Sequence, residues 1–494
     1  MPRNVRIPKV DKSDPALRQL MRQVRQEVEK RHGEHLTFEQ RRDAAAVIMG
    51  EALWLDEEED LQAEATDADE IEVQGKRYRA LDQPSSAVYF GRWGGHLVKE
   101  SLYRELGLHN GPTLKPLELR VGIVEHLTPD FARILGELAA ICSSRVMEQI
   151  LEAVGLTSPS RAFVEDRVTK MADQVADQIE DLETKARESQ TLPVAASLTC
   201  GMDRMSIRMA EPSGANAEQR PKREEPYQRT PPDPKEFHYR MAWVGSATLY
   251  DQDGAALRTF RHALPAECDP VEVARRVAAD VGDVVKRNPT IDVACIQDGA
   301  PELDLLPQTL RKVLPSDVEL KELTDIKHTM GYLEDVADTG ESEEKQQREK
   351  AWYWSRLLRD DAGIERVVNK LRRQARELKK AQAKSQVGEQ DNAQPEEHAT
   401  RREALEAALT YIKSRAEKMR YASRYRANLT IGSGETENTC WQMQNRVTRP
   451  AQAWAPEGSL RGILTLRGLV LSELWSGAWR AFIESRRRPV MIAA

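Results

Sequence analysis

Two aspartates stand in apolar segments that are typical of buried strands. Asp203 interrupts the segment LTCGMDRMSI, and Asp298 directly follows the segment DVACIQ. A buried carboxylate is costly unless it is paired with a cation or binds a metal ion. Two carboxylates on neighbouring strands could hold Mg²⁺, a hard cation that prefers oxygen ligands and keeps part of its water shell.

A third carboxylate would complete a two-metal site, which clamps the attacking and leaving oxygens of phosphoryl transfer. Glu435 and Glu437 both follow the tetrapeptide Ile431-Gly-Ser-Gly434, where a helix is expected to begin. They are two residues apart and therefore point to different faces of that helix. An acid in the first helical turn can also serve only the helix dipole, so the spacing leaves the third ligand open.

The elements that must position these residues follow a definite order from residue 195 to 328. The patterns predict three strands joined by hairpins, then a helix, a strand, a helix and a strand. This order is typical of a mixed RNase H-like sheet in an α/β domain, rather than of a doubly wound dinucleotide-binding fold. In such a sheet the first and fourth strands are neighbours, which would bring Asp203 and Asp298 together.

The sequence after this segment predicts an all-α insertion over residues 331–430. Residues 345–384 contain 13 Lys and Arg against five Asp and Glu, and residues 410–426 add six basic residues beside three tyrosines. A polar stretch at 385–400 predicts a linker, and the prolines and charges of 211–236 predict a surface loop.

The first part of the chain predicts a small β region preceded and followed by helices. Residues 51–70 hold ten acidic residues and no basic one, which indicates a solvated linker or, as a second possibility, an acidic segment that masks a DNA-binding surface. Residues 143–175 predict a helix-turn-helix whose recognition helix starts near Ser160. A plain pair of antiparallel helices fits the same pattern equally well.

The composition excludes several classes of protein. The 494 residues (55.9 kDa) suggest several domains, and the net charge of −7 argues against a uniformly basic nucleic-acid binder without excluding local basic surfaces. The five cysteines form no CxxC pair, so they support neither a zinc ribbon nor a disulfide framework, and free thiols fit the cytoplasm. With neither a signal-peptide pattern nor a long apolar run, we expect neither secretion nor a membrane span.

Several segments together resemble bacterial insertion-sequence transposases of the ISKra type. The similarity covers roughly residues 70–482, and its strongest part comprises IGSGETENTC, Arg446, Trp454, Gly458 and LTLRGLVLSELWSGAWRAF. Weaker parts are LTCGMDRMSI, IQDGAPEL, GKRYRAL and KPLELRVGI. The resemblance implies an RNase H-like catalytic core with a DDE triad, and its glutamate, three residues beyond the IGSG-like tetrapeptide, selects Glu437 beside Asp203 and Asp298.

The resemblance also implies roles for residues between Asp298 and Glu437. Asp325-Ile-Lys-His328 looks like a (D/C)xxH element, which would put His328 near the scissile phosphate, although a structural histidine is the alternative. The long separation fits the helical insertion of hAT-like relatives, where Trp352 and Trp354 could stack on a flipped base or simply pack between helices. The basic residues expected to contact DNA phosphates are Arg372, Arg373, Lys379, Lys380, Arg420, Arg424 and Arg426.

Two departures from the family pattern modify these expectations. Relatives often carry cysteine pairs in a segment that reads YRELGLHNGPTLKPLE here, so no zinc is predicted. Arg204 follows the first aspartate, where the relatives commonly have glycine.

The resemblance therefore predicts a DDE transposase that cleaves and transfers DNA strands with Mg²⁺, or Mn²⁺ as a substitute. Its expected partners are transposon terminal inverted repeats, target DNA and further copies of the chain, as a homodimer or higher oligomer on DNA in the bacterial cytoplasm. A domesticated transposase acting as a DNA-binding regulator, and an RNase H-like nuclease or resolvase, are the alternatives.

The expected domains follow from these patterns. They are a helical segment with an acidic linker at 1–70, a small β region at 71–124, a helix-turn-helix-like DNA-binding domain at 125–190, the catalytic domain at 195–330 and 431–485, and the α-helical insertion at 331–430.

Overall fold

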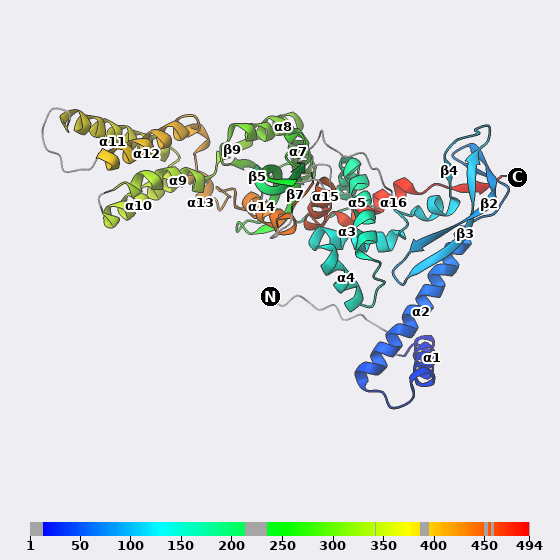
Figure 1. The fold of residues 1–494 in the computed structure, drawn as a ribbon. Helices are drawn as coiled ribbons and strands as arrows, with labels where there is room; N and C mark the ends of the chain where they lie inside the picture. The colour runs from blue at the N-terminus through cyan, green and yellow to red at the C-terminus, as the bar shows by residue number, and fades with distance from the viewer. Residues whose placement is uncertain are drawn as a thin grey trace. The chain divides into compact units, whose positions relative to one another are not determined.

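The chain has a mixed α/β fold with two five-stranded sheets (Figure 1). The computed structural model describes residues 13–212, 235–340, 342–385, 395–448, 453–455 and 459–493. It divides into two compact units, one of Met1–Ala172 with Trp479–Ala494 and the other of Asp173–Ala478. No helix of the described residues is both long enough and apolar enough to cross a bilayer.

The first unit contains an antiparallel sheet of order β10-β1-β2-β3-β4 together with helices. Its strands are β1 (Glu70–Val73), β2 (Lys76–Phe90), β3 (Gly95–Glu105), β4 (Thr113–Leu114) and β10 (Val490–Ile492). Its helices are α1 (Pro15–His32), α2 (Phe38–Glu64), η1 (Glu118–Gly122), α3 (Pro129–Ile141) and α4 (Ser144–Ala153). Helix α5 (Arg161–Asp177) follows, so helices occupy both positions where the helix-turn-helix pattern predicts them.

The acidic segment 51–70 is a helix for most of its length and not the linker that its charge predicts. Helix α2 is capped by Thr37, whose side chain accepts the Gln40 amide, and it continues without interruption to Glu64. Leu61 packs against the β2–β3 sheet, and Glu57 pairs with the buried His96 at 3.1 Å. One face of the helix therefore packs on the sheet. A count of charges along the chain cannot reveal this packing.

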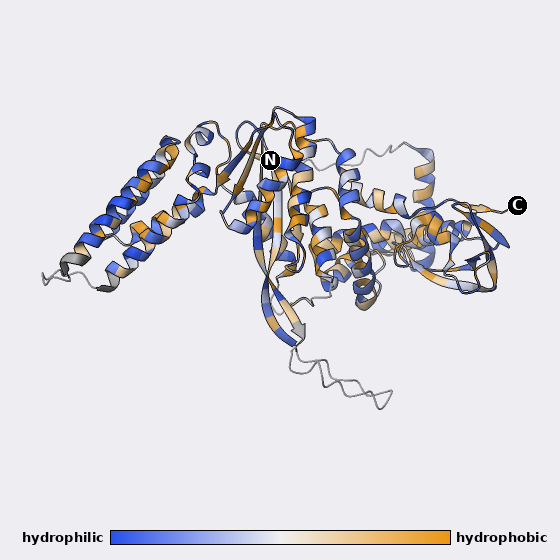
Figure 2. Cartoon of the chain, turned by 90° about the horizontal axis from the view of Figure 1, so that it is seen from above, coloured by the Kyte–Doolittle hydropathy of each residue, from blue (hydrophilic) through white to orange (hydrophobic). Residues whose placement is uncertain are grey.

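The second unit contains the sheet whose strands carry the two candidate aspartates. The strands are β5 (Ser197–Pro212), β6 (Lys235–Tyr250), β7 (Ala256–Leu264), β8 (Asp292–Gln297) and β9 (Leu320–Thr324), in the order β7-β6-β5-β8-β9. The first three are antiparallel, whereas β8 runs parallel to β5 and β9 parallel to β8. Apolar residues run along these strands (Figure 2), and the strand positions agree with the sequence prediction.

Helices cover both faces of this sheet. Successive side chains of each strand point to opposite faces, so both faces offer side chains for a helix to pack against. Gly245 of β6 approaches Val273 and Val277 of α7 (Pro270–Arg287), which covers one face. The hydroxyl of the neighbouring Ser246 forms a hydrogen bond of 2.8 Å with the hydroxyl of Thr436 in α14 (Gly434–Val447). Helix α14 therefore covers the other face of the sheet. Other helices of the unit are α6 (Ile179–Glu188), η2 (Pro301–Asp304), α8 (Leu305–Val313) and α15 (Leu460–Leu471), and α16 (Trp475–Arg486) follows.

The chain between β9 and α14 is helical, as the sequence predicts. The helices are α9 (Ile326–Asp338), α10 (Glu343–Arg359), α11 (Gly363–Ser385), α12 (Pro395–Lys413), η3 (Ala416–Lys418) and α13 (Ala422–Arg426). Helices α9 to α12 lie side by side (Figure 1), and one apolar cluster joins them to Ala294, Ile296 and Leu323 of β8 and β9. The insertion therefore shares its hydrophobic core with the sheet.

Two predicted loops differ in extent from the structure. Of the predicted linker 385–400, Ser385 is the last residue of α11 and residues 395–400 belong to α12. Residues 386–394 lie outside the described residues. In the predicted loop 211–236, both ends belong to β5 and β6, and residues 213–234 lie outside the described residues.

Five buried charged side chains join α6, α7 and β7 on the face of the sheet that α7 covers. Arg276 pairs with Glu183 at 2.6 Å, Arg187 pairs with Asp280 at 2.8 Å, and His262 contacts Asp280 at 2.5 Å and Glu183 at 3.3 Å. Burial opposes the charge of Glu183, but Arg276 and His262 hold its pKa well below the usual range. Burial likewise opposes a charged His262, but Asp280 and Glu183 raise its pKa.

Replacing Glu183 is expected to destabilise the fold strongly. Glu183→Gln would leave Arg276 buried beside a neutral partner, and breaking a buried pair in this way costs about 3–5 kcal/mol. Urea denaturation of the purified chain would measure the loss. The control is Glu180→Gln on the same helix, whose pair with Arg275 is exposed, so its change should stay below about 1 kcal/mol. Equal effects of the two variants would contradict the role of the network.

The same network predicts a pH range of greatest stability. Glu183 has a lowered folded pKa, so its contribution is complete above its unfolded value of 4.5 and is lost as the pH falls. His262 has a raised folded pKa, so its contribution is complete below 6.5 and is lost as the pH rises through the folded value. Denaturation midpoints measured against pH should peak between these values, and His262→Gln should remove the decline on the alkaline side.

Candidate active site

The parallel pairing of β5 with β8 brings Asp203 and Asp298 to neighbouring positions. The ladder ends with the pair Cys200 and Cys295, and each aspartate lies three residues beyond its cysteine, Asp203 on β5 and Asp298 directly after β8. Burial raises the pKa of Asp203, and the negative charge of Asp298 raises it further. The carboxylate of Asp298 is thus one of the charges that act on Asp203.

Asp203 also receives groups that stabilise its charge. Its Oδ1 accepts the backbone amide of Arg204 at 2.7 Å, and its Oδ2 lies 3.6 Å from the thiol of Cys440, which donates to it. These bonds and the positive charge that His328 can carry lower the pKa of Asp203 but do not cancel the effect of burial. His328 thus lies near enough to Asp203 to act on its charge, with its side chain exposed, and a contact of His328 with a phosphate stays a prediction.

Helix α14 brings Glu437 to the same face of the sheet. Thr436 packs directly on Gly201, where a side chain would meet the Thr436 hydroxyl at 2.7 Å and the Ile296 carbonyl oxygen at 2.6 Å. One turn along the helix, Cys440 contacts Asp203, and the nearby charges of Asp203 and Glu437 add to the burial that raises the pKa of the Cys440 thiol. Glu437 is therefore the acid of α14 that shares surroundings with Asp203.

Glu435 belongs to a different environment. Its carboxylate is 3.9 Å from Arg261, and together with burial it raises the pKa of Tyr250 to about 12. The two glutamates thus face different ways, as their spacing predicts, and Glu437 is the one whose charge acts on the Cys440 thiol that contacts Asp203.

Asp325 fixes the loop that precedes α14. It is fully buried and accepts the Ser433 hydroxyl at 2.7 Å, the Ser433 backbone amide and the His328 amide at 3.0 Å. The Ser433 hydroxyl also lies 3.2 Å from Glu437, and its single proton can serve only one acceptor at a time. Asp325 therefore holds the start of α9 and the start of α14 together, beside the candidate site.

The carboxylates suit a hard divalent cation chemically but do not form a complete cage. Asp203 and Asp298 offer oxygen ligands and repel each other, and a cation between them would remove this repulsion. Within the described residues, no group of three or more His, Cys, Asp or Glu side chains is close enough to hold a metal ion. The thiol of Cys440 and the hydroxyl of Ser433 occupy oxygens that a metal would take.

The two tryptophans of the insertion pack against its apolar cluster. Trp352 and Trp354 are partly buried, and Lys370 lies 4.4 Å from the centre of the Trp352 ring. Both positions agree with the packing alternative that the sequence left open. Stacking on a base stays a prediction.

The basic residues expected to contact DNA divide into two groups. Those with exposed side chains are Arg372, Arg373, Lys379, Lys380, Arg420 and Arg426. Arg424 does not fit the expectation, because it is buried and pairs with Asp292 of β8 at 2.6 Å while also donating to the Thr430 carbonyl. Its role is to hold α13 on the sheet, which a basic cluster in the sequence does not reveal.

Residues of the C-terminal signature stabilise the fold near the site. The ring nitrogen of Trp454 donates to the Val447 carbonyl at 2.9 Å, and its own carbonyl accepts the amide of Ala210 in β5 at 2.8 Å. Arg446 is buried with its guanidinium 5.8 Å from the Trp454 ring. Gly458 lies outside the described residues.

Among the contacts with the candidate acids or their backbone that sequence reasoning missed are those of Cys440, Tyr411 and Arg415. Cys440 contacts Asp203, and its spacing of three from Glu437 and four from Thr436 on one helix could have indicated this. Tyr411 and Arg415 donate to the carbonyls of Asp298 and Gly299 from over a hundred residues away, and no local pattern signals such a contact.

Comparison with known proteins leaves the function to be argued from the site itself. No model of a protein family matches the sequence, and no curated protein matches it significantly. A fold alone does not define a function, so the chemistry of the site carries the argument.

The raised pKa of Asp203 predicts that its charge lowers stability near neutral pH. Asp203→Asn should raise the thermal unfolding midpoint at pH 7 by about 2 °C, and the gain should shrink as the pH falls through the raised folded pKa towards 3.8, because the folded wild-type side chain takes up its proton in that range. Saturating Mg²⁺ should stabilise the wild-type chain but not the variant.

Differential scanning calorimetry with and without Mg²⁺ would measure both effects. Asp253→Asn, in the exposed turn between β6 and β7, is the matched control and should behave as the wild-type chain does. A Mg²⁺-dependent shift that persists in Asp203→Asn would rule out Asp203 as a ligand.

Proposed function

We propose that this chain is a DDE transposase, a metal-dependent enzyme that cleaves transposon ends and transfers the freed DNA strands. The observation that carries the proposal is the closeness of Asp203 and Asp298, with Glu437 on the helix that packs over the strand of Asp203. Asp203 lies on β5 and Asp298 directly follows the parallel strand β8, close enough for the charge of Asp298 to raise the pKa of Asp203, and Glu437 lies on a helix that packs directly on β5. Paired acids of this kind are costly unless they serve binding or catalysis.

The arrangement of the sheet supports an RNase H-like catalytic domain. Three antiparallel strands, followed by two parallel strands added beside the first, give the order β7-β6-β5-β8-β9. This is the order in which the first and fourth strands are neighbours, and it is the reason that the two aspartates meet.

The protein's own residues would bind and orient the reacting groups. Mg²⁺ held by the carboxylates would lower the pKa of an attacking water or 3′-hydroxyl and neutralise charge on the leaving oxygen. Asp203 and Asp298 would supply oxygens from the sheet, and Glu437 would supply oxygens from α14 once Ser433 donates to Asp325 instead. His328, exposed at the start of α9, is suited to contact a phosphate beside the site.

Exposed basic side chains of the insertion support DNA as the substrate. Helix α11 presents Arg372, Arg373, Lys379 and Lys380 to solvent, and Arg420 and Arg426 are exposed near the end of the insertion. Contacts of this type bind phosphates without regard to base sequence, and their affinity falls steeply with salt.

Removing a triad carboxylate is expected to abolish catalysis while leaving DNA binding intact. Asp298→Asn or Glu437→Gln should each lower the rate of Mg²⁺-dependent strand cleavage by about a hundredfold or more, because metal stabilisation of the transition state is worth several kcal/mol. The assay uses labelled DNA that carries the inverted repeats flanking the gene, with a mobility shift to measure binding.

Glu435→Gln is the matched control, because it changes an acid of the same helical turn that faces Arg261 instead of Asp203. It should retain cleavage. Full activity of the Asp298 and Glu437 variants would exclude the triad. Cleavage without any joined product would identify a nuclease, and end binding without cleavage by the wild-type chain would identify a regulator.

A further inference from the structure

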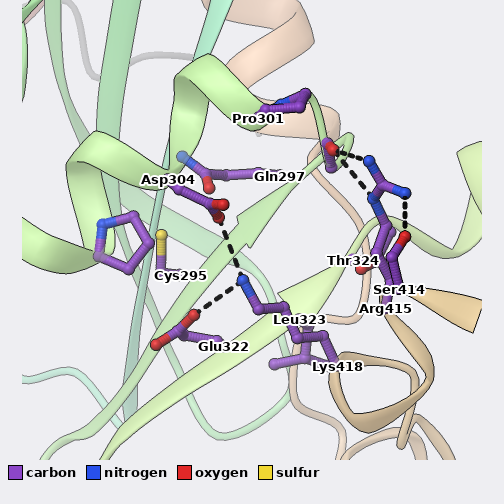
Figure 3. Close-up of a pocket in the computed structure, with 12 residues that line it drawn as sticks. Cys295, Gln297, Pro301, Asp304, Glu322, Leu323, Thr324, Ser414, Arg415 and Lys418 are labelled. Atoms are coloured by element: carbon purple, nitrogen blue, oxygen red, sulfur yellow. Dashed lines mark hydrogen bonds and ion pairs between the residues drawn. The ribbon is translucent and has the colours of Figure 1, made fainter.

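The loop that carries Asp298 is held by side chains of the helical insertion. The hydroxyl of Tyr411, in α12, donates to the Asp298 carbonyl oxygen at 2.6 Å. The guanidinium of Arg415 donates to the Gly299 carbonyl oxygen, with its Nε at 2.9 Å, and also to the hydroxyl of Ser414 at 2.8 Å (Figure 3). Two successive peptide carbonyls beside the carboxylate thus depend on residues more than 110 positions further along the chain.

The sheet itself does not hold these two peptides. The ladder of β8 with β5 ends at Cys295, and the ladder with β9 ends at Gln297, whose carbonyl accepts the Asp325 amide at 2.7 Å. Beyond that point, the bond from the Ala300 amide to the Asp298 carboxylate, at 2.8 Å, is local to the loop. The insertion therefore supplies the long-range contacts of the loop at Asp298 and Gly299.

The backbone of the loop and the side chain of Arg415 fit each other closely. Gly299 has φ +88°, a conformation that glycine adopts readily and other residues rarely adopt. A β-carbon at Gly299 would lie 2.8 Å from Cδ of Arg415, so a larger residue there would displace the guanidinium. The turn after Asp298 and the position of Arg415 are consequently interdependent.

Side chains do not fill the space between the Asp298 loop and the segment that carries Arg415. Polar contacts therefore hold the loop. A cavity of about 250 Å³ lies between the ends of β8 and β9 and the segment after α12, with Cys295, Thr324 and Arg415 in its lining (Figure 3). Across it, Lys418 pairs with Asp304 at 3.2 Å and with Glu322 at 3.0 Å. Discrete polar bonds, rather than a filled apolar core, connect the two sides here.

Tyr411 and Arg415 together form a clamp on the Asp298 loop, and contacts within the insertion hold both residues in place. The Tyr411 ring stacks on Tyr332 of α9 with a centroid distance of 4.1 Å, and Arg415 lies 4.6 Å above the Tyr411 ring. A shift of α12 relative to the sheet would move both donors together.

We propose that Tyr411 and Arg415 are positioning residues that orient the Asp298 carboxylate for metal binding, so that the insertion controls whether the site can hold its metal. The coupling to catalysis rests on the proposed function, because it requires Asp298 to be a ligand. The contact between the insertion and the loop stands independently of that role and can be measured without DNA or turnover.

Tyr411→Phe removes the donor and keeps the ring. We expect the Mn²⁺ concentration for half-maximal binding, followed by electron paramagnetic resonance, to rise roughly fivefold to tenfold, as the loss of one buried hydrogen bond implies. The metal concentration for half-maximal DNA cleavage should rise by the same factor, and excess Mn²⁺ should restore the rate, whereas a partly unfolded variant would not recover.

Tyr353→Phe is the matched control, because Tyr353 is a buried tyrosine of the insertion whose hydroxyl donates to Glu349 at 2.9 Å, away from the loop. It should leave metal affinity unchanged. Arg415→Lys should weaken Mn²⁺ binding, since the ammonium cannot make both guanidinium contacts with Gly299.

Hydrogen exchange of the amides of residues 298–304, measured without metal or DNA, separates the two proposals. Faster exchange in Tyr411→Phe with weaker Mn²⁺ binding supports the clamp, even if the wild-type chain fails to cleave DNA, in which case only the transposase proposal falls. Unchanged exchange and unchanged Mn²⁺ affinity in Tyr411→Phe would overturn the clamp, even if the wild-type chain is fully active.

Discussion

The candidate site depends on the absence of a side chain at Gly201. At this position in the middle of β5, a β-carbon would lie 2.6 Å from the Ile296 carbonyl of β8 and 2.7 Å from the Thr436 hydroxyl of α14. Three elements from distant parts of the chain therefore meet at one residue, two positions before Asp203. Because α14 can pack onto the sheet here, its next turn brings Cys440 to Asp203, and the charge of Glu437 lies near the Cys440 thiol.

The helical insertion packs against the sheet that carries the candidate acids. Its apolar cluster includes Ala294, Ile296 and Leu323 of the sheet, and its last segment returns Arg424 to pair with Asp292 at the start of β8. Asp325 joins the beginning of the insertion to Ser433 at its end. The two ends of the insertion are thus fixed at the sheet beside the candidate acids, which makes mechanical coupling between the insertion and the site physically direct.

Buried charged side chains have two different roles in the second unit, Asp173–Ala478. Glu183 and Asp280 face Arg276, Arg187 and His262, so their charges are compensated and they hold two helices on the sheet. Asp203 faces another carboxylate and a thiol, and its pKa is raised instead of lowered. Uncompensated charge of this kind costs stability, and such a cost is commonly retained where a protein binds or reacts.

The sequence by itself determined the elements of the second unit and the acids worth considering. Apolar alternation and runs placed β5 to β9 correctly, and helical periodicity predicted the insertion, because these patterns are local consequences of which side chains face the core. It also narrowed the third acid to two glutamates. It erred where a partner lies far along the chain, as with the acidic segment that forms α2 and the basic residue Arg424 that is buried.

Only the tertiary structure decided which residues share an environment. The parallel pairing of β5 with β8 brings Asp203 near Asp298, and the packing of Thr436 on Gly201 leaves Glu437 near Cys440 and Glu435 near Arg261. The contacts of Tyr411 and Arg415 with the Asp298 loop span more than 110 residues and leave no trace in local spacing. Periodicity reports which way a side chain points from its own strand or helix, whereas the neighbour that it meets is fixed by how separate elements pack.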